Sequence, residues 1–329
     1  MTVTQSLPGL NPKTVGATAT TKTCIPDFLI LGAAKCGTTS LHGWLNQHPQ
    51  IQMSFPKEPV YFELEYDRGP DFYRSTYFAG SDGRRLLGDA RTANLFFPWV
   101  PARVKESNPE AKLIILLRNP IDRCLAQWWT EFRRDKEPLH FEEAVMANLE
   151  RLRTGARYDS ADAFWTDAPV YQLPRYTGER HRADYHRPYQ KTADPTAIFR
   201  TYVDAGYYAE QIERYRRLFP EKQIRIFLAE DLRSNPGQVL RDVCELIGVR
   251  TEAIHDIDCR PQNVGKPMKR SKAIKYWLTQ RLHGKSVAYA DVRRRPAVRP
   301  QFRQFLADHF RPFNSDLSKL LNRDLSHWV

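Results

Sequence analysis

A lysine lies inside a turn whose residues suit the binding of an anion. The stretch FLILGAAKCGTTSL, residues 28–41, joins an apolar run to a helix-like segment, and Lys35 lies between Gly32 and Gly37. Backbone N–H groups at such a strand–turn–helix junction, together with the helix N-terminus, bind phosphate and similar anions. Hydroxyl donors follow in the first helical turn at Thr38, Thr39 and Ser40. We therefore expect an anion site here, although loops of this kind also occur as plain structural turns.

The lysine is misplaced for an ATP-binding loop. That motif, G-x-x-x-x-G-K-[ST], has its lysine directly after the second glycine, where this sequence has Thr38. The usual lysine contact with the β- and γ-phosphates is therefore missing. The next apolar run, LIILL at 113–117, ends in Arg118, and neither strand end offers a carboxylate for magnesium. The pattern predicts a ligand with two separate anionic groups and no metal.

These two motifs, about 80 residues apart, carry a family resemblance. FLILGAAKCGTTSL followed by LIILLRNPIDRCLAQW resembles the sulfotransferases that use 3′-phosphoadenosine 5′-phosphosulfate (PAPS), in particular heparan sulfate sulfotransferase domains and soluble bacterial relatives that act on natural products. The likeness runs from about residue 25 to Trp328, with 151–205 unmatched. It implies transfer of a sulfonate group to a hydroxyl or amine of a small-molecule or carbohydrate acceptor.

The resemblance assigns the donor-binding residues. Lys35 would neutralise charge on the oxygen that leaves sulfur, and Arg118 would bind the 3′-phosphate, which suits guanidinium geometry. The rest of the first loop would hold the 5′-phosphate: Cys36, Gly37, Thr38, Thr39 and Ser40. Relatives usually share the 3′-phosphate with a serine on the following helix, where this sequence has Ala126.

KEPVYF, residues 57–62, resembles the motif that supplies the family's general base. Glu58 is the candidate, and the alternative is a surface glutamate paired with Lys57. Many relatives have a histidine two positions after this glutamate, whereas here the residue is Val60. Phe62, in the same stretch, is a candidate acceptor contact.

Three further positions are matched less directly. In GDARTANLF, Asp89 takes an acidic family position, Ala90 replaces a lysine, and Arg91 offers a cation one step along, where a strand would turn it to the other side. Tyr208, in GYYAEQIERYRRLFP, would face the nucleotide and is a candidate substrate contact; the alternative is an ordinary packed aromatic. The C-terminal basic run RRRPAVRPQFRQFL would close over the donor with Arg293. Lys269 and Arg270 are the alternative to that run, and a solvated basic surface is a third.

Composition agrees with an anionic ligand and excludes little else. The 329 residues carry 50 Lys and Arg against 38 Asp and Glu, a net charge of +12, which favours an anionic partner. A P-loop-type kinase and a non-catalytic polyanion-binding protein are therefore the rival functions, although the sequence has no recognised nucleic-acid motif. The five cysteines form no C-x-x-C pair, which predicts a reducing, cytoplasmic location. No secretory signal or membrane span is expected, and the oligomeric state is not predicted.

The alternation of apolar runs with helical patterns predicts an α/β architecture, and the resemblance implies a P-loop-like three-layer fold with a central, mainly parallel sheet flanked by helices. We expect a flexible tail over 1–23 and a single domain over 24–329. An insertion at about 151–205, rich in arginine and tyrosine, would shape the acceptor pocket. Strands are expected at 28–31, 113–117 and 223–228, the last near an edge. Helix caps are expected at Asn119 and Asn235, a helix end at Gly248, and a buried C-terminal stripe at Phe302, Phe305, Leu306 and Phe310.

Overall fold

A five-stranded parallel sheet forms the centre of the fold, in the order β2–β3–β1–β4–β5. The computed structural model describes residues 26–134, 136–155, 200–262, 267–282 and 294–329; the expected tail over 1–23 lies outside them. The strands are β1 (Phe28–Gly32), β2 (Ile51–Met53), β3 (Leu86–Ala90), β4 (Lys112–Leu117) and β5 (Ile224–Leu228).

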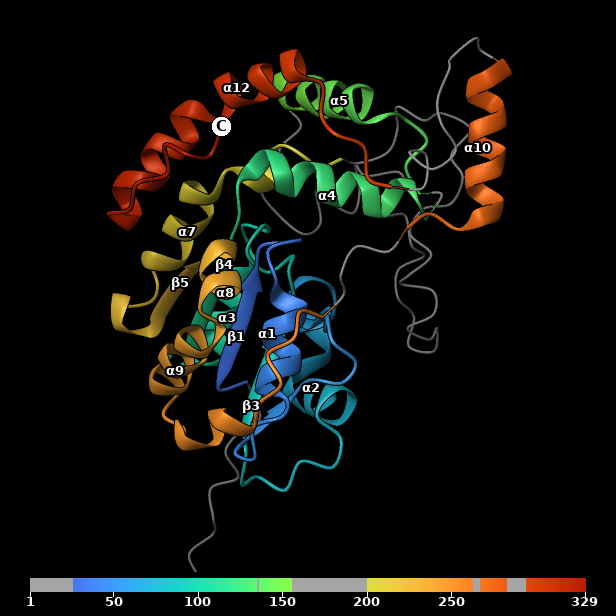
Figure 1. Cartoon of the computed structure of the whole chain (residues 1–329). Helices are drawn as coiled ribbons and strands as arrows, with labels where there is room; N and C mark the ends of the chain where they lie inside the picture. The colour runs from blue at the N-terminus through green and yellow to red at the C-terminus, as the bar shows by residue number, and fades with distance from the viewer. Residues whose placement is uncertain (1–25, 135, 156–199, 263–266, 283–293) are drawn as a thin grey trace, which may run out of the picture.

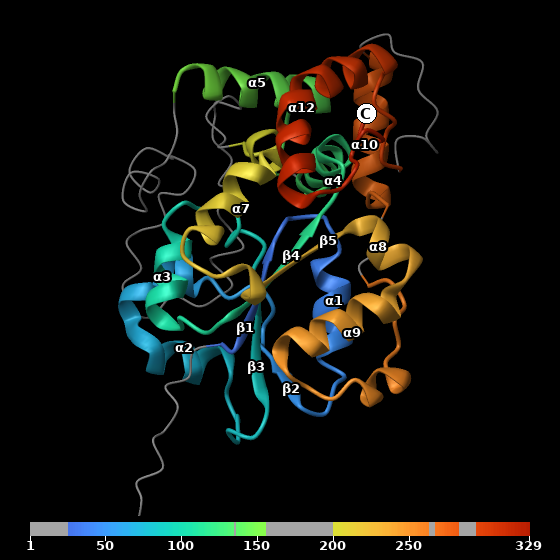
Figure 2. The ribbon, with the colours of Figure 1, turned by 90° about the vertical axis from the view of Figure 1, so that its left-hand side faces the viewer.

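Helices cover both faces of the sheet, so the predicted α/β class is confirmed. Helices α1 (Thr38–Leu45), α8 (Ala229–Ser234) and α9 (Pro236–Ile247) lie on one side (Figure 2). Helices α2 (Gly69–Tyr77), α3 (Val100–Ser107) and α7 (Tyr208–Arg216) lie on the other. A further group lies beyond the carboxyl ends of the strands (Figure 1): α4 (Pro120–Phe132), α5 (Phe141–Arg153), α10 (Arg270–Leu282) and α12 (Pro300–Leu321).

The apolar runs seen in the sequence become the central strands. Every residue of β1 is buried, and so is β4 except its first residue, because helices cover both faces. Strand β5 lies at the sheet edge as predicted, with Arg225 exposed. The short strands β2 and β3 were not among the expected strands, since LLGDA and IQM carry too few apolar residues to form a clear pattern.

The predicted helix boundaries are confirmed. The Asn119 side chain accepts the N–H groups of Ile121 and Asp122 at the start of α4, and Asn235 accepts that of Gln238 at the start of α9. Gly248 ends α9 in the left-handed conformation, with φ 78°. The predicted buried stripe of α12 is confirmed in part: Leu306 and Phe310 are buried, Phe302 is half-buried, and Phe305 is 41% exposed.

Buried polar pairs hold both flanks of the expected insertion, of which residues 156–199 lie outside the described ranges. On the far flank, the Arg200 guanidinium donates to both oxygens of Glu137 at 2.8 Å, and both side chains are almost fully buried. On the near flank, Arg151 of α5 pairs with Asp204. The two flanks are therefore joined to each other and to the helical layer.

Candidate active site

Three neighbouring strand ends bring the predicted site residues together. Strand β1 lies between β3 and β4, and the Lys35 turn follows β1 directly. Arg118 follows β4 on one side of that turn. On the other side, Glu58 is fixed to the end of β3, because its N–H donates to the Ala90 carbonyl at 3.1 Å. The carboxyl ends of these three strands therefore present a carboxylate, a lysine-bearing turn and an arginine in that order.

The first turn leaves backbone donors for an anion. Lys35 and Gly37 both have positive φ, 69° and 103°, so the chain reverses sharply before α1. A side chain at Gly37 would also come within 2.9 Å of Leu232 Cδ2, which makes glycine necessary there. Helix α1 has no side-chain cap at its N-terminus. The Ser40 N–H donates to the Gly37 carbonyl at 2.9 Å, so the N–H groups of Thr38 and Thr39 are the ones in this turn that a bound anion could accept.

Positive charge surrounds Lys35. Burial is the largest cause of a lowered pKa of Lys35, followed by the charges of Arg134 and Arg133; Glu131 partly offsets them by raising the pKa, and Arg118 lowers it slightly. Within the described ranges no carboxylate lies within ion-pairing distance of its ammonium. A bound anion would relieve this repulsion and favour the charged lysine, so the residues fit a strongly negative ligand.

The backbone of Arg118 is held by a hydrogen bond, while its guanidinium makes only long contacts. Its Nη1 lies 3.5 Å from the Lys35 carbonyl, and its Nη2 lies 3.9 Å from the Asp122 carboxylate, both long contacts. Its own carbonyl accepts the Tyr208 hydroxyl at 2.9 Å. Arg118 is thus oriented toward the first turn without a strong partner of its own.

The Glu58 carboxylate is half-buried and surrounded by donors. It accepts the Thr92 N–H at 2.9 Å, the Thr92 hydroxyl at 3.3 Å and Arg91 Nη1 at 3.5 Å, and it pairs with the Lys57 ammonium. Burial acts to raise the pKa of Glu58, but the charges of Lys57 and Arg91 and the hydrogen bonds outweigh it and lower the pKa overall. Glu58 is therefore ionised at neutral pH. The ion pair between Glu58 and Lys57, expected as the alternative to a catalytic role, is present, and it lies at the site and not on a remote surface.

Arg91 faces the site, contrary to the alternation argument. That argument fails because β3 ends at Ala90, so Arg91 lies in the turn beyond it. Its guanidinium pairs with Glu58 and with the buried Glu63. Neighbouring Asp89 is fully buried and accepts the Tyr73 hydroxyl at 2.6 Å; burial raises the pKa of Asp89 to about 7.

Several predicted contact residues are buried beneath the loops. Phe62 and Tyr208 are each 1% exposed, Phe62 among the rings of Tyr61 and Tyr73, so they support the site from below. Burial also raises the pKa of the Cys36 thiol to about 11. The Ser40 hydroxyl accepts the Gln262 N–H at 3.0 Å. Direct ligand contacts by these side chains stay predictions.

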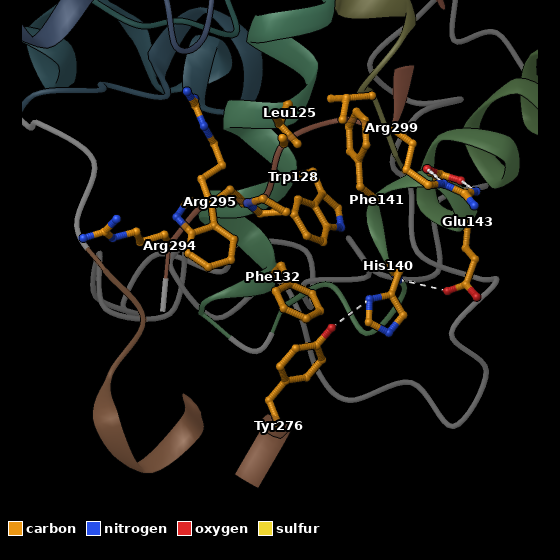
Figure 3. Close-up of a pocket in the computed structure, with 15 residues that line it drawn as sticks. Leu125, Trp128, Phe132, His140, Phe141, Glu143, Tyr276, Arg294, Arg295 and Arg299 are labelled. Carbon is orange, nitrogen blue, oxygen red and sulfur yellow. Dashed lines mark hydrogen bonds and ion pairs between the residues drawn. The ribbon is translucent and has the colours of Figure 1, made fainter. Parts of the chain in front are cut away.

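A cavity of about 760 Å³ lies along one face of α4 (Figure 3). Its lining includes an aromatic group: Trp128, Trp129, Phe132, Phe141 and Tyr276. The Tyr276 hydroxyl lies 3.1 Å from His140 Nδ1. Ala126 is not among the lining residues, so the cavity uses a different face of α4 from the one expected to meet the donor.

Arg295 lies at this cavity and within electrostatic reach of Arg118. It lines the cavity, and burial together with neighbouring Arg118 lowers the pKa of Arg295. The predicted Arg293 lies outside the described residues. The alternative cations, Lys269 and Arg270, are exposed at the start of α10.

Sequence reasoning missed three kinds of site residue. Lys57 was considered only as a surface partner, and Glu63 was not considered, although it directly follows the motif that contains Glu58. Arg133 and Arg134 lie at the end of α4, where only the helix direction reveals that they approach Lys35. Among the described residues, no three potential metal ligands of the His, Cys, Asp or Glu types cluster together. None of the described helices has the length and apolar character needed to cross a bilayer.

Together, the fold and these strand ends define an α/β protein whose strand ends place cations and backbone N–H groups side by side. The model of the sulfotransferase domain family matches residues 25–286, so the chain belongs to that family. A sulfotransferase from Alicyclobacillus acidocaldarius has a similar structure, with a TM-score of 0.62 and 27% identity, covering 93% of this chain and 99% of that one. The predicted family, fold and enzyme class are confirmed, and the kinase and polyanion-binding alternatives lose support.

Curated relatives are longer proteins. The bifunctional heparan sulfate N-deacetylase/N-sulfotransferase 2 of Bos taurus is 25% identical over 313 residues, which cover 92% of this chain and 30% of that protein. The bifunctional heparan sulfate N-deacetylase/N-sulfotransferase 1 of Xenopus laevis is 28% identical over 316 residues, covering 91% and 30%. The chain thus spans about 30% of the length of these relatives.

Proposed function

We propose that this sulfotransferase takes its sulfonate from PAPS and transfers it to a hydroxyl or amine of a small-molecule or carbohydrate acceptor. The observation that carries the proposal is the order of the three strand ends, with Glu58, the Lys35 turn and Arg118 side by side. PAPS is charged at both ends of its nucleotide. Two adjacent cationic loops match that charge pattern.

The chain's residues have distinct roles in this proposal. The N–H groups and the hydroxyls of Thr38 and Thr39 bind the 5′-phosphate, and Arg118 binds the 3′-phosphate with Arg295 nearby. Lys35 stabilises the negative charge that grows on the departing phosphate oxygen. Glu58 takes the proton of the acceptor as the acceptor attacks sulfur.

The acceptor and the location are finer predictions. The N-sulfotransferase names of the curated relatives support an amine or sugar acceptor, and the 151–205 insertion remains the segment expected to select it. A role in natural-product biosynthesis rests on the resemblance alone. All four described cysteines are free thiols, which supports the predicted reducing cytoplasm.

A thermal-shift comparison tests the donor. The desulfated product, 3′,5′-bisphosphoadenosine, should raise the melting temperature, and the rise should grow with the logarithm of its concentration over Kd, whereas ATP with magnesium should raise it far less. Arg118→Ala should remove most of the shift, because a charge-assisted hydrogen bond contributes about 1.5–3 kcal/mol. Equal shifts from both nucleotides would contradict the proposal. An acceptor screen with PAPS, followed by mass spectrometry of the bisphosphate, then identifies the reaction.

A further inference from the structure

Four donor groups surround the Glu58 carboxylate and reduce its affinity for a proton. Thr92 donates through both its N–H and its hydroxyl, while the cations of Arg91 and Lys57 face the same two oxygens. A carboxylate that accepts several hydrogen bonds and faces two cations has little affinity for a proton. A general base works best when its pKa lies near the working pH. In this arrangement, Glu58 is charged but weak as a base.

Of the two cations in this group, Lys57 is the one that can leave the carboxylate. The Thr92 N–H belongs to the backbone, and Arg91 is also held by Glu63, which is 1% exposed. Glu58 itself is fixed by its φ of 71° and by its N–H bond to the end of β3. By contrast, Lys57 has Glu58 as its sole ion-pair partner within the described ranges, and its ammonium is on a flexible four-carbon side chain.

The donor would supply a competing anion. The proposed sulfonate position lies beside the Lys35 turn, one strand from Glu58. We propose that Lys57 restrains Glu58 until the donor binds, and that the donor's negative charge then draws the Lys57 ammonium off the carboxylate. This inference rests on the proposed function. Glu58 would become a stronger base only when the sulfonate is in place.

The transfer step that follows is balanced. The acceptor oxygen or nitrogen forms a bond to sulfur while the bond between sulfur and the bridging phosphate oxygen breaks. The acceptor's proton goes to Glu58, and the electron pair of the broken bond leaves with the bisphosphate. Lys57 does not touch the reacting atoms in this scheme, so it is a positioning residue that controls the base.

Other titratable groups near Glu58 must be separated from this effect. Arg91 stays charged across the useful pH range. Burial and the Lys57 charge lower the pKa of His42, on α1, to about 4. Asp89, at the end of β3, has its pKa raised to about 7 by burial, so it titrates in the working range. Every measurement should therefore be repeated with Asp89→Asn present.

Two titrations of the same carboxyl test the inference. Carbon NMR of the Glu58 side chain, assigned by its loss in Glu58→Gln, follows ionisation in the donor-free protein. The acid limb of the single-turnover rate with PAPS bound follows ionisation in the complex. Hydrolysis of the donor, with water as the acceptor, provides the rate where no other acceptor is known.

In the unchanged protein, the acid limb of the single-turnover rate with PAPS bound should lie at higher pH than the NMR titration of Glu58 without the donor. In Lys57→Met the NMR titration should move up to meet the limb, while the limb stays in place. Lys57→Arg should keep the gap, and Lys57→Gln is a second neutral variant if Lys57→Met melts early. The plateau rate should stay within about tenfold of the parent, against about 10²–10⁴ for losing a base.

Three results would overturn the inference: no gap in the unchanged protein, a gap that persists in Lys57→Met, or an acid limb that moves with the NMR titration. The last result would mean that Lys57 stays on Glu58 throughout as a structural ion pair. Failure of the proposed function is a different outcome. It would be seen as full turnover in Glu58→Gln or as no binding of 3′,5′-bisphosphoadenosine.

Discussion

The two sides of the Lys35 turn handle charge in opposite ways. Toward β4, Lys35 and Arg118 have no close carboxylate partner among the described residues, and further arginines add to the positive charge. Toward β3, Lys57 and Arg91 are matched by Glu58 and Glu63. The first side is prepared for an anion from outside, while the second is already neutralised from within. Under the proposed function, the first side binds the donor, while the second side holds a base that becomes effective when Lys57 leaves it.

Removing the base should give the largest effect on turnover. Glu58→Gln keeps the shape and the Thr92 hydrogen bonds but cannot accept a proton, so turnover should fall by about 10²–10⁴-fold. Binding of 3′,5′-bisphosphoadenosine should change little, because Glu58 lies on the neutralised side. Steady-state kinetics and calorimetry measure the two quantities. Retained turnover would remove Glu58 as the base.

Removing the lysine should affect both rate and binding. Lys35→Ala should lower turnover by about 10²–10³-fold, since one electrostatic contact to the leaving oxygen is lost. It should also weaken bisphosphate binding, which Glu58→Gln should not do. Melting temperature is the control, because relief of the local repulsion predicts no loss of stability. If Lys35→Ala left nucleotide binding intact, the contrast between the two sides would fail.

Asp89, on the β3 side of the Lys35 turn, should make the stability of the protein depend on pH. Its pKa of about 7 in the fold lies above the value of about 3.9 in an unfolded chain. The stabilising contribution of the protonated carboxyl is therefore full below about pH 4 and is lost as pH rises through about 7. Relative to Asp89→Asn, the parent's melting temperature should fall over this range. A constant difference between the two proteins across the range would contradict the raised pKa.

The smallest effect is expected from Tyr208, whose hydroxyl donates to the Arg118 carbonyl. Tyr208→Phe removes one hydrogen bond to the Arg118 carbonyl, about 1 kcal/mol, so donor affinity should weaken about fivefold or less. The acceptor KM should not change, since the ring is buried. A selective rise in the acceptor KM would instead support the substrate contact predicted for Tyr208 from the sequence.

More of the β4 side of the Lys35 turn than of the β3 side could be predicted from the sequence. The turn around Lys35, Arg118 and the Asn119 cap could be predicted because each depends on a local strand–turn–helix pattern. Strand β3 and the direction of Arg91 could not, because they depend on where a short strand stops and what pairs beside it. The approach of Arg133 and Arg134 to Lys35 depends on how α4 crosses the strand ends, which no spacing encodes.

The paired anchors Arg200–Glu137 and Arg151–Asp204 have a consequence for diversification. They tie down both ends of the intervening chain, so its length and composition can change without strain on the sheet or the catalytic edge. The entropy of closing a longer loop grows only slowly with its length. Because this segment is the one proposed to select the acceptor, its exchange would change the acceptor preference while the transfer chemistry is inherited unchanged.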